Sequence, residues 1–119
     1  MTKLWLNGNN IGHAGAVSLA EGLKHNGALK TLWLGDNQIG DDGAKALAES
    51  GFGALTELSL EANEIGDVGA AALADALKVN TALKTVHLSD NKISADGKQA
   101  LRDAWTTSGR DLKDRGLDL

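Results

Sequence analysis

The residue types that most often carry chemistry are few in this chain and lie far apart. Three histidines, His13, His25 and His87, could transfer a proton or bind a metal only if the fold brought them together. We expect them at a helix start, at a helix end and on a strand, where they cannot converge on one group. No serine is placed beside a histidine and an acid by any pattern in the sequence. No enzyme activity is therefore predicted.

Carboxylates and glycines are more numerous, but their spacing does not build a metal or phosphate site. Asp41, Asp42, Asp67 and Asp96 fall near expected helix starts, where the helix dipole favours negative charge. A calcium site would need several carboxylates around one centre, which a regular series of helices does not provide. The 15 glycines form no loop of the type that cradles phosphates. We therefore expect no cofactor and no metal.

The composition is that of a single small domain of 119 residues. A formal charge of −4 argues against nucleic-acid binding, which needs a basic face. No apolar run is long enough to span a membrane, and the chain does not start with the apolar segment of a secretory signal. There is no cysteine, which is compatible with a reducing compartment. The sequence thus predicts a cytoplasmic protein without nucleic-acid or membrane partners.

A two-part repeat organises almost the whole chain. The first part ends in Asn-x-Ile, and its asparagine recurs at Asn9, Asn37, Asn63 and Asn91, at spacings of 28, 26 and 28 residues. Apolar residues alternate before each asparagine, which predicts a strand with one buried face. The second part, Gly-x-x-Gly-Ala-x-x-Leu-Ala in the first three copies, has helical spacing. We expect repeats at about 1–28, 29–54, 55–82 and 83–110, with 111–119 as a partial fifth repeat or a C-terminal cap.

Individual residues add local expectations to this pattern. The four asparagines should form a buried ladder, because their amides can satisfy backbone groups in the turn that leaves each strand. Ser94 replaces the glycine of the other repeats and is a plausible helix N-cap. The second repeat is shorter, so its helix should end early, with Phe52 covering the gap. Trp105 should pack under the last helix, and Gly116–Leu119 should begin a fifth strand.

The expected architecture is an α/β horseshoe of four full repeats. A strand, a helix and a second parallel strand form a right-handed crossover, and its repetition gives a superhelix with a concave parallel sheet and outer helices. The pattern L-x-x-L-x-L-x-x-N-x-I-G-x-x-G-A-x-x-L-A-x-x-L resembles the ribonuclease-inhibitor-like class of leucine-rich repeats over about residues 1–105. This resemblance implies a binding scaffold for proteins or peptides. The chain departs from mammalian ribonuclease inhibitor in having no cysteine.

The outward strand residues should form columns down the concave sheet, where we expect the partner to bind. Trp5 and Trp33 would lie side by side on neighbouring strands about 4.8 Å apart and expose on the order of 300 Å². Tryptophan is a frequent binding hot spot, although a ring lying flat on its neighbour would also suit a strand. The predicted partner-binding residues are Lys3, Trp5, Asn7, Thr31, Trp33, Asp36, Glu57, Ser59, Glu61, Thr85, His87 and Asp90.

The character of the partner, and a different role, remain open at this point. Asp36, Glu57, Glu61 and Asp90 outnumber Lys3 on the predicted face, which favours a basic or amphipathic partner. The alternative is a structural or assembly element. In that case the uncapped N-terminal edge would pair with a second copy as a homodimer, or the chain would be a fragment of a longer repeat array. An engineered scaffold with no natural ligand would show the same regularity.

Overall fold

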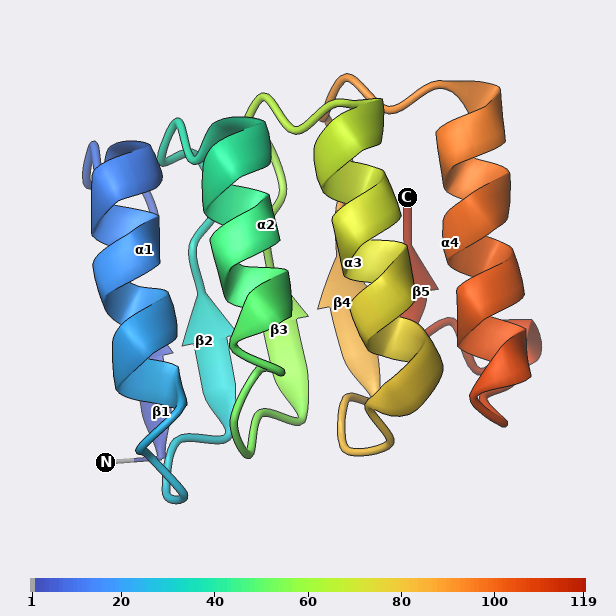
Figure 1. The fold of residues 1–119 in the computed structure, drawn as a ribbon, viewed down its shortest axis with the longest axis horizontal. Coiled ribbons are helices and arrows are strands. Elements are labelled where there is room, and N and C mark those ends of the chain that lie inside the picture. The colour runs from blue at the N-terminus through green and yellow to red at the C-terminus, as the bar shows by residue number, and fades with distance from the viewer. Residues whose placement is uncertain (1) are drawn as a thin grey trace.

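A computed structural model describes residues 2–119 of the chain. Its helices lie side by side in one layer, and a sheet forms the second layer behind them (Figure 1). The strands are β1 (Lys3–Trp5), β2 (Thr31–Trp33), β3 (Glu57–Ser59), β4 (Thr85–His87) and β5 (Leu117–Asp118). The helices are α1 (Gly12–Leu23), α2 (Gly40–Glu49), α3 (Asp67–Val79) and α4 (Ala95–Thr107), followed by a short 3-10 helix, η1 (Leu112–Asp114).

The five strands form one parallel sheet in sequence order, and their register is the one that the repeat predicts. Trp5 pairs with Trp33, Trp33 with Ser59, and Ser59 with His87. Strands are about 4.8 Å apart, whereas a helix with its side chains is about 10 Å wide, so stacked units place the sheet on the concave side. The α/β leucine-rich-repeat architecture is confirmed.

The helices begin where the glycines and Ser94 predict. α1 and α2 start at Gly12 and Gly40, and the Ser94 side chain accepts a hydrogen bond from the Gly97 N–H at the start of α4, as expected for an N-cap. Gly43 is required for close packing of α1 and α2. A Cβ at Gly43 would collide with the side chain of Ile39 and would lie 3.0 Å from the Cβ of Ala16 on α1. The helices therefore approach each other closely.

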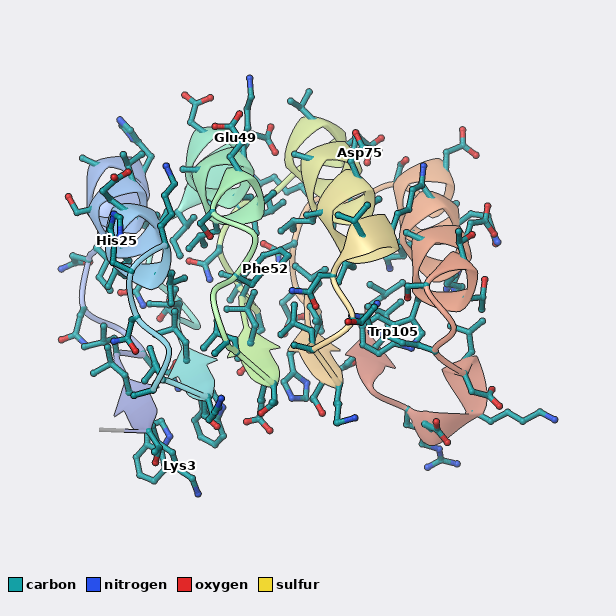
Figure 2. All side chains as sticks on the ribbon, turned by 60° about the horizontal axis from the view of Figure 1, so that its bottom comes forward. Lys3, His25, Glu49, Phe52, Asp75 and Trp105 are labelled. Carbon is teal, nitrogen blue, oxygen red and sulfur yellow. The ribbon has the colours of Figure 1, made fainter. Side chains whose placement is uncertain are left out.

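The core lies between the two layers and is almost entirely aliphatic. Leu32 and Leu34 on the strand side and Leu47 on the helix side have no exposed surface. α2 is shorter than the other α-helices, and Phe52 fills the space beyond its end, while Trp105 lies under α4; both rings point into the interior (Figure 2). The predictions for Phe52 and Trp105 are confirmed.

The asparagine ladder exists, and Asn37 shows how it works. Its Nδ2 donates to the carbonyls of Leu6 (2.8 Å) and Leu34 (3.0 Å), and its Oδ1 accepts from the N–H groups of Asn9 (2.7 Å) and Ile11 (3.4 Å). One amide thus satisfies backbone groups in its own turn and in the preceding repeat. Without this amide the N–H groups of Asn9 and Ile11 would lose their side-chain acceptor, and an unpaired N–H group that is shielded from water is costly.

Burial of the ladder differs along the stack. Asn37 and Asn63 are fully buried, Asn91 is partly buried, and Asn9 is exposed. The prediction of a buried ladder is therefore correct for the two inner positions and wrong for Asn9. The physical reason is that Asn9 is covered by a neighbouring repeat on one side only.

Two carboxylates cap helices in the following repeat. Asp41 Oδ1 accepts from the N–H groups of Gly66 (2.7 Å) and Gly69 (2.9 Å), at the start of α3. Asp67 accepts from the Ser94 N–H (2.8 Å) and the Ser94 hydroxyl (2.6 Å), at the start of α4. Because the first N–H groups of a helix have no partner within it, the second repeat stabilises the third and the third stabilises the fourth.

Asp67 should make the stability of the protein depend on pH. Its side-chain hydrogen bond from Ser94, and then the backbone bond, hold the pKa of Asp67 below its usual value. A depressed pKa means that the carboxylate stabilises the fold above the unfolded pKa of about 4, and that this effect is lost as pH falls through the folded pKa. We expect Asp67→Asn to lower Tm at pH 7 and to have a shrinking effect as the pH approaches 3. A difference in Tm that stays constant over this range would refute the assignment.

His13 occupies the repeat position of Asp41 and Asp67 but cannot act as they do. Among the hydrogen bonds of residues 2–119, no side chain accepts from the first turn of α2. The His13 Cα lies 3.4 Å from where a Cβ of Gly43 would be, so a carboxylate at this site is within reach of that turn. We expect His13→Asp to raise the free energy of unfolding by about 0.5–1 kcal/mol. Urea denaturation should show a higher midpoint with an unchanged m-value. An unchanged midpoint would mean that a carboxylate at position 13 does not cap α2.

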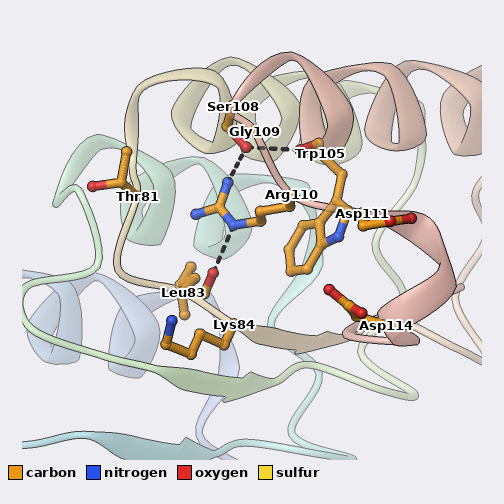
Figure 3. A pocket seen from close by; sticks show the side chains of 9 residues that line it. All are labelled: Thr81, Leu83, Lys84, Trp105, Ser108, Gly109, Arg110, Asp111 and Asp114. Atoms are coloured by element: carbon orange, nitrogen blue, oxygen red, sulfur yellow. Dashed lines mark hydrogen bonds between the residues drawn. The ribbon is translucent and has the colours of Figure 1, made fainter.

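The segment after α4 is tied to the last repeat by Arg110. All five N–H groups of its guanidinium are used, on the carbonyls of Leu83, Leu77 and Asn80, the Asn80 side chain and the Ser108 hydroxyl. Figure 3 shows the bonds to Leu83 and Ser108. The guanidinium carbon also lies 4.7 Å from the centre of the ring of Trp105. Burial lowers the pKa of Arg110 from its ordinary value. The predicted fifth strand is present as β5, beside β4.

Candidate binding surface

Two stacked tryptophans dominate the concave face, the outward side of the sheet. Trp5 is 63% exposed, and its ring lies 5.4 Å from that of Trp33, with 24° between the ring planes. Trp33 is half-buried, and its indole N–H donates to the carboxylate of Glu57 on the next strand. The expectation that the rings lie side by side is confirmed. Because Trp33 is fixed by Trp5 on one side and by Glu57, the ring that a partner reaches most readily is that of Trp5.

The role of Glu57 differs from what the sequence suggested. It was predicted as one of several acidic contacts, but it also holds the orientation of Trp33. Glu57 lies on the strand next to that of Trp33 and in the neighbouring column, so the register places the two side chains close enough for a contact. Nothing in the sequence specifies which rotamer Trp33 adopts, and for that reason the pairing could not be predicted.

The other predicted residues share the face but differ in accessibility. Lys3 projects away from the side that carries the helices (Figure 2). The central column of the face consists of Trp5, Trp33, Ser59 and His87. Ser59 is only 4% exposed, so it supports the surface and does not offer a contact to a partner. The exposed members are Lys3, Trp5, Asn7, Asp36, Glu61 and Asp90, and the half-buried ones are Thr31, Trp33, Glu57, Thr85 and His87.

Three members of the set take part in the local structure of the face. The Asn7 side-chain oxygen accepts from the Gly35 N–H (2.8 Å), so its acceptor is already used between β1 and β2. Asp36 and Asp90 have φ angles of 56° and 60°, in the left-handed region that asparagine and aspartate tolerate better than most residues. Their carboxylates remain exposed at the edge of the concave face.

Asp118 is a further acidic residue on this face that was not predicted as a site residue. β5 brings it next to His87, with 3.4 Å between His87 Nδ1 and a carboxylate oxygen of Asp118. The sequence could have predicted this position. A strand at Gly116–Leu119, aligned with the strands of the earlier repeats, places Asp118 next to His87 in the central column. Asp118 adds to the acidic character of the C-terminal half of the face.

Other kinds of site find no support in the described residues. His13 lies on α1, His25 follows α1 and His87 lies on β4, so the structure keeps them on separate elements, as predicted. Within residues 2–119, no cluster of three potential metal ligands occurs, and no helix has the length and apolar character to cross a membrane. A pocket of about 530 Å³ near Arg110 is lined in part by residues that anchor the C-terminal segment, among them Leu83, Trp105 and Ser108 (Figure 3).

A solved structure with a similar fold supports the architecture. The chain resembles a structure described as leiomodin-1 actin-binding site 2, with a TM-score of 0.73 and 19% sequence identity. The similarity covers 97% of this chain and 83% of the other. At this identity the likeness concerns the fold alone. No curated protein matches the chain in sequence.

Sequence comparison with family models identifies the repeats themselves. A model described as a leucine-rich repeat matches residues 1–20, 25–48, 55–74 and 79–101, one match for each predicted repeat. The matches together span more than half of the chain. Both the sequence pattern and the register of the sheet agree with this assignment. The chain belongs to the leucine-rich repeat family.

Proposed function

We propose that the chain is a protein- or peptide-binding scaffold that uses the concave face, with Trp5 and Trp33 as its anchors. The observation that carries this proposal is a largely exposed tryptophan stacked on a second one, which is itself held by Glu57. A pre-oriented aromatic surface loses little conformational freedom on binding, and tryptophan is enriched among residues that contribute most to affinity. The alternative role of these rings, as strand formers, predicts no loss of binding when Trp5 is replaced.

The charges on the face favour a basic or amphipathic partner. Asp36, Glu61 and Asp90 are exposed on the concave face, and Lys3 is the one lysine or arginine in the predicted set. An apolar or aromatic side chain of the partner would cover Trp5, while lysine or arginine side chains would meet the carboxylates. Such complementarity mainly raises the association rate and the specificity of binding.

A binding role without catalysis also fits the comparisons. Leucine-rich repeats are generally binding scaffolds, and the similar fold of leiomodin-1 is described as an actin-binding site. The partner proposed here is a protein or peptide of basic character, without a cofactor. The ribonuclease-inhibitor-like subclass and a cytoplasmic location are proposals that rest on the Asn-x-Ile-Gly-x-x-Gly junction and on the lack of cysteine.

Selection from a random peptide library tests this function without a known partner. We expect the wild-type protein to enrich peptides with aromatic and basic residues. Trp5→Ala should weaken their binding by about 30-fold, which corresponds to about 2 kcal/mol. Val68→Ala is the matched control, because Val68 is an apolar residue with 68% exposure on α3. Peptides that bind Trp5→Ala as well as wild type would exclude the concave face around Trp5 as the site.

Assembly is the second candidate, and the open side of the first repeat favours it. β1 has a neighbour on one side only, and Leu4, Leu6, Ile11 and Leu19 are partly buried where their counterparts in the second repeat are fully buried. An unpaired strand edge can pair with another chain. Light scattering over a range of concentrations separates the candidates, because a homodimer through this edge would show a mass that rises with concentration.

A further inference from the structure

The open side of the first repeat has the surface of an interface between repeats. This N-terminal flank consists of Leu4, Leu6, Asn9, Ile11, Ser18 and Leu19. Five of these six residues, all except Leu4, line one cavity of about 500 Å³ together with Gly15. In the second repeat the corresponding leucines and isoleucine are fully buried against the first repeat. The flank thus continues an established interface that no residue of the described chain covers on this side.

The side-chain oxygen of Asn9 indicates which kind of unit would bind to the N-terminal flank. In each of the three later repeats, the asparagine Oδ1 accepts from two backbone N–H groups of the preceding Asn-x-Ile turn. Among residues 2–119, no group donates to Oδ1 of Asn9, although its Nδ2 donates to the Asn7 carbonyl (3.1 Å), as the later asparagines donate to the carbonyl two residues before them. Asn9 is therefore already oriented for the two N–H groups of one more Asn-x-Ile turn.

At the opposite side of the stack, α4 carries charged residues where the inner helices carry alanine. Ala44 and Ala48 of α2 are buried, and the Ala44 methyl lies 3.2 Å from where a Cβ of Gly69 on α3 would be. The corresponding positions of α4 are Lys98 and Arg102, whose longer charged side chains do not offer this alanine surface. A second copy of the chain therefore lacks the alanine surface on its C-terminal side. Two copies joined through their N-terminal flanks would leave both Asn9 acceptors without donors.

We propose that the N-terminal flank docks one further leucine-rich-repeat unit, stacked parallel to the first repeat, and not a second copy of this chain. The docked unit donates the two N–H groups of its Asn-x-Ile turn to Asn9 Oδ1. Its helix presents alanines to Gly15 and Ser18 of α1, as α1 presents alanine to Gly43 of α2. This inference deepens the assembly candidate, and the peptide-binding role of the concave face is tested separately on the unextended chain.

Fusion of one repeat to the full chain tests the proposal. A copy of residues 55–82, joined to the start of the chain, keeps the 28-residue spacing of asparagines and supplies the buried alanines of α3. The counterparts of Lys3, which are Thr31, Glu57 and Thr85, each donate their N–H to a carbonyl of the preceding repeat. The amide hydrogen of Lys3 should therefore exchange at least about tenfold more slowly in the fusion, because β1 becomes an inner strand. The helical circular dichroism signal of the fusion should exceed that of the unextended chain by the contribution of one additional helix.

Two variants keep this test specific. Ser18 is exposed on α1, and its counterpart in the second repeat, Ala46, packs against the core. Ser18→Arg should leave exchange in the unextended chain unchanged and should abolish the slowing in the fusion. Asn9→Ala should reduce the urea midpoint of the fusion at least about twice as much as that of the unextended chain, because the acceptor is buried only when the flank is covered.

Distinct results would overturn the proposal. The appended repeat could leave β1 exchange and helical signal unchanged while the rest of the chain stays folded, which would show that the flank does not accept a repeat. The unextended chain could form a dimer in which the β1 amides become protected, which would identify a second copy as the occupant. Neither result affects the peptide-binding comparison of wild type with Trp5→Ala, so failure of one proposal is distinguishable from failure of the other.

Discussion

Asn37→Ala should lower the free energy of unfolding by about 3 kcal/mol, because the side chain satisfies buried backbone groups in two repeats at once. Its amide donates to the carbonyls of Leu6 and Leu34 and accepts from the N–H groups of Asn9 and Ile11. Alanine leaves the N–H groups of Asn9 and Ile11 without this acceptor, and the carbonyls of Leu6 and Leu34 each lose one of two side-chain donors. The side chain that is removed has no exposed surface. A cavity the size of the lost amide adds to the penalty.

The same substitution at Asn9 is the matched control. Asn9 has the same place in the repeat and makes the same bonds within its own turn, but it is exposed, so water can replace the lost amide. We expect Asn9→Ala to cost about 1 kcal/mol or less in the unextended chain. Urea unfolding of both variants measures the difference. Equal losses would show that burial of the ladder does not determine its contribution to stability.

Arg110→Ala should destabilise the protein by about 3 kcal/mol and release the C-terminal segment from the last repeat. Hydrogen bonds to a charged group contribute more than neutral ones, and here five N–H groups bind Leu83, Leu77, Asn80 and Ser108. The substitution also removes the guanidinium that covers the ring of Trp105. We expect a lower urea midpoint and a red shift of the tryptophan emission at intermediate urea concentrations.

Two further variants separate charge from geometry in this prediction. Arg110→Lys keeps the positive charge but loses the planar fork, so most of the destabilisation should remain. Lys113→Ala, an exposed residue of η1 in the same segment, should change stability by no more than about 0.5 kcal/mol. If Arg110→Lys matched wild type, charge alone would account for the effect and the pattern of five hydrogen bonds would be irrelevant to it.

The sequence predicted the fold because its signals are periodic. The four asparagines fixed the register of β1 to β4, so Trp5 and Trp33 could be placed side by side from spacing alone. The shorter second repeat predicted both the early end of α2 and the burial of Phe52. Each of these features repeats along the chain, or interrupts the repeat at a recognisable position.

Contacts that depend on side-chain rotamers could not be predicted in the same way. The bond between Trp33 and Glu57, the capping of α3 by Asp41 and four of the five bonds of Arg110 join residues 24 or more positions apart in the sequence. Their residue types are compatible with many surface positions. Ser59 was correctly placed in the central column, but its burial depends on the side chains around it and not on the column.

Indole N–H resonances test the central claim, that the concave face around Trp5 and Trp33 is the binding surface. The chain has three tryptophans, so a nitrogen–proton correlation spectrum contains three such signals, and Trp105, at 1% exposure, is an internal control. Titration with a peptide selected by the wild-type protein should shift the signals of Trp5 and Trp33 and leave that of Trp105 in place. A shift confined to Trp105, or saturable binding with all three signals unchanged, would contradict the account.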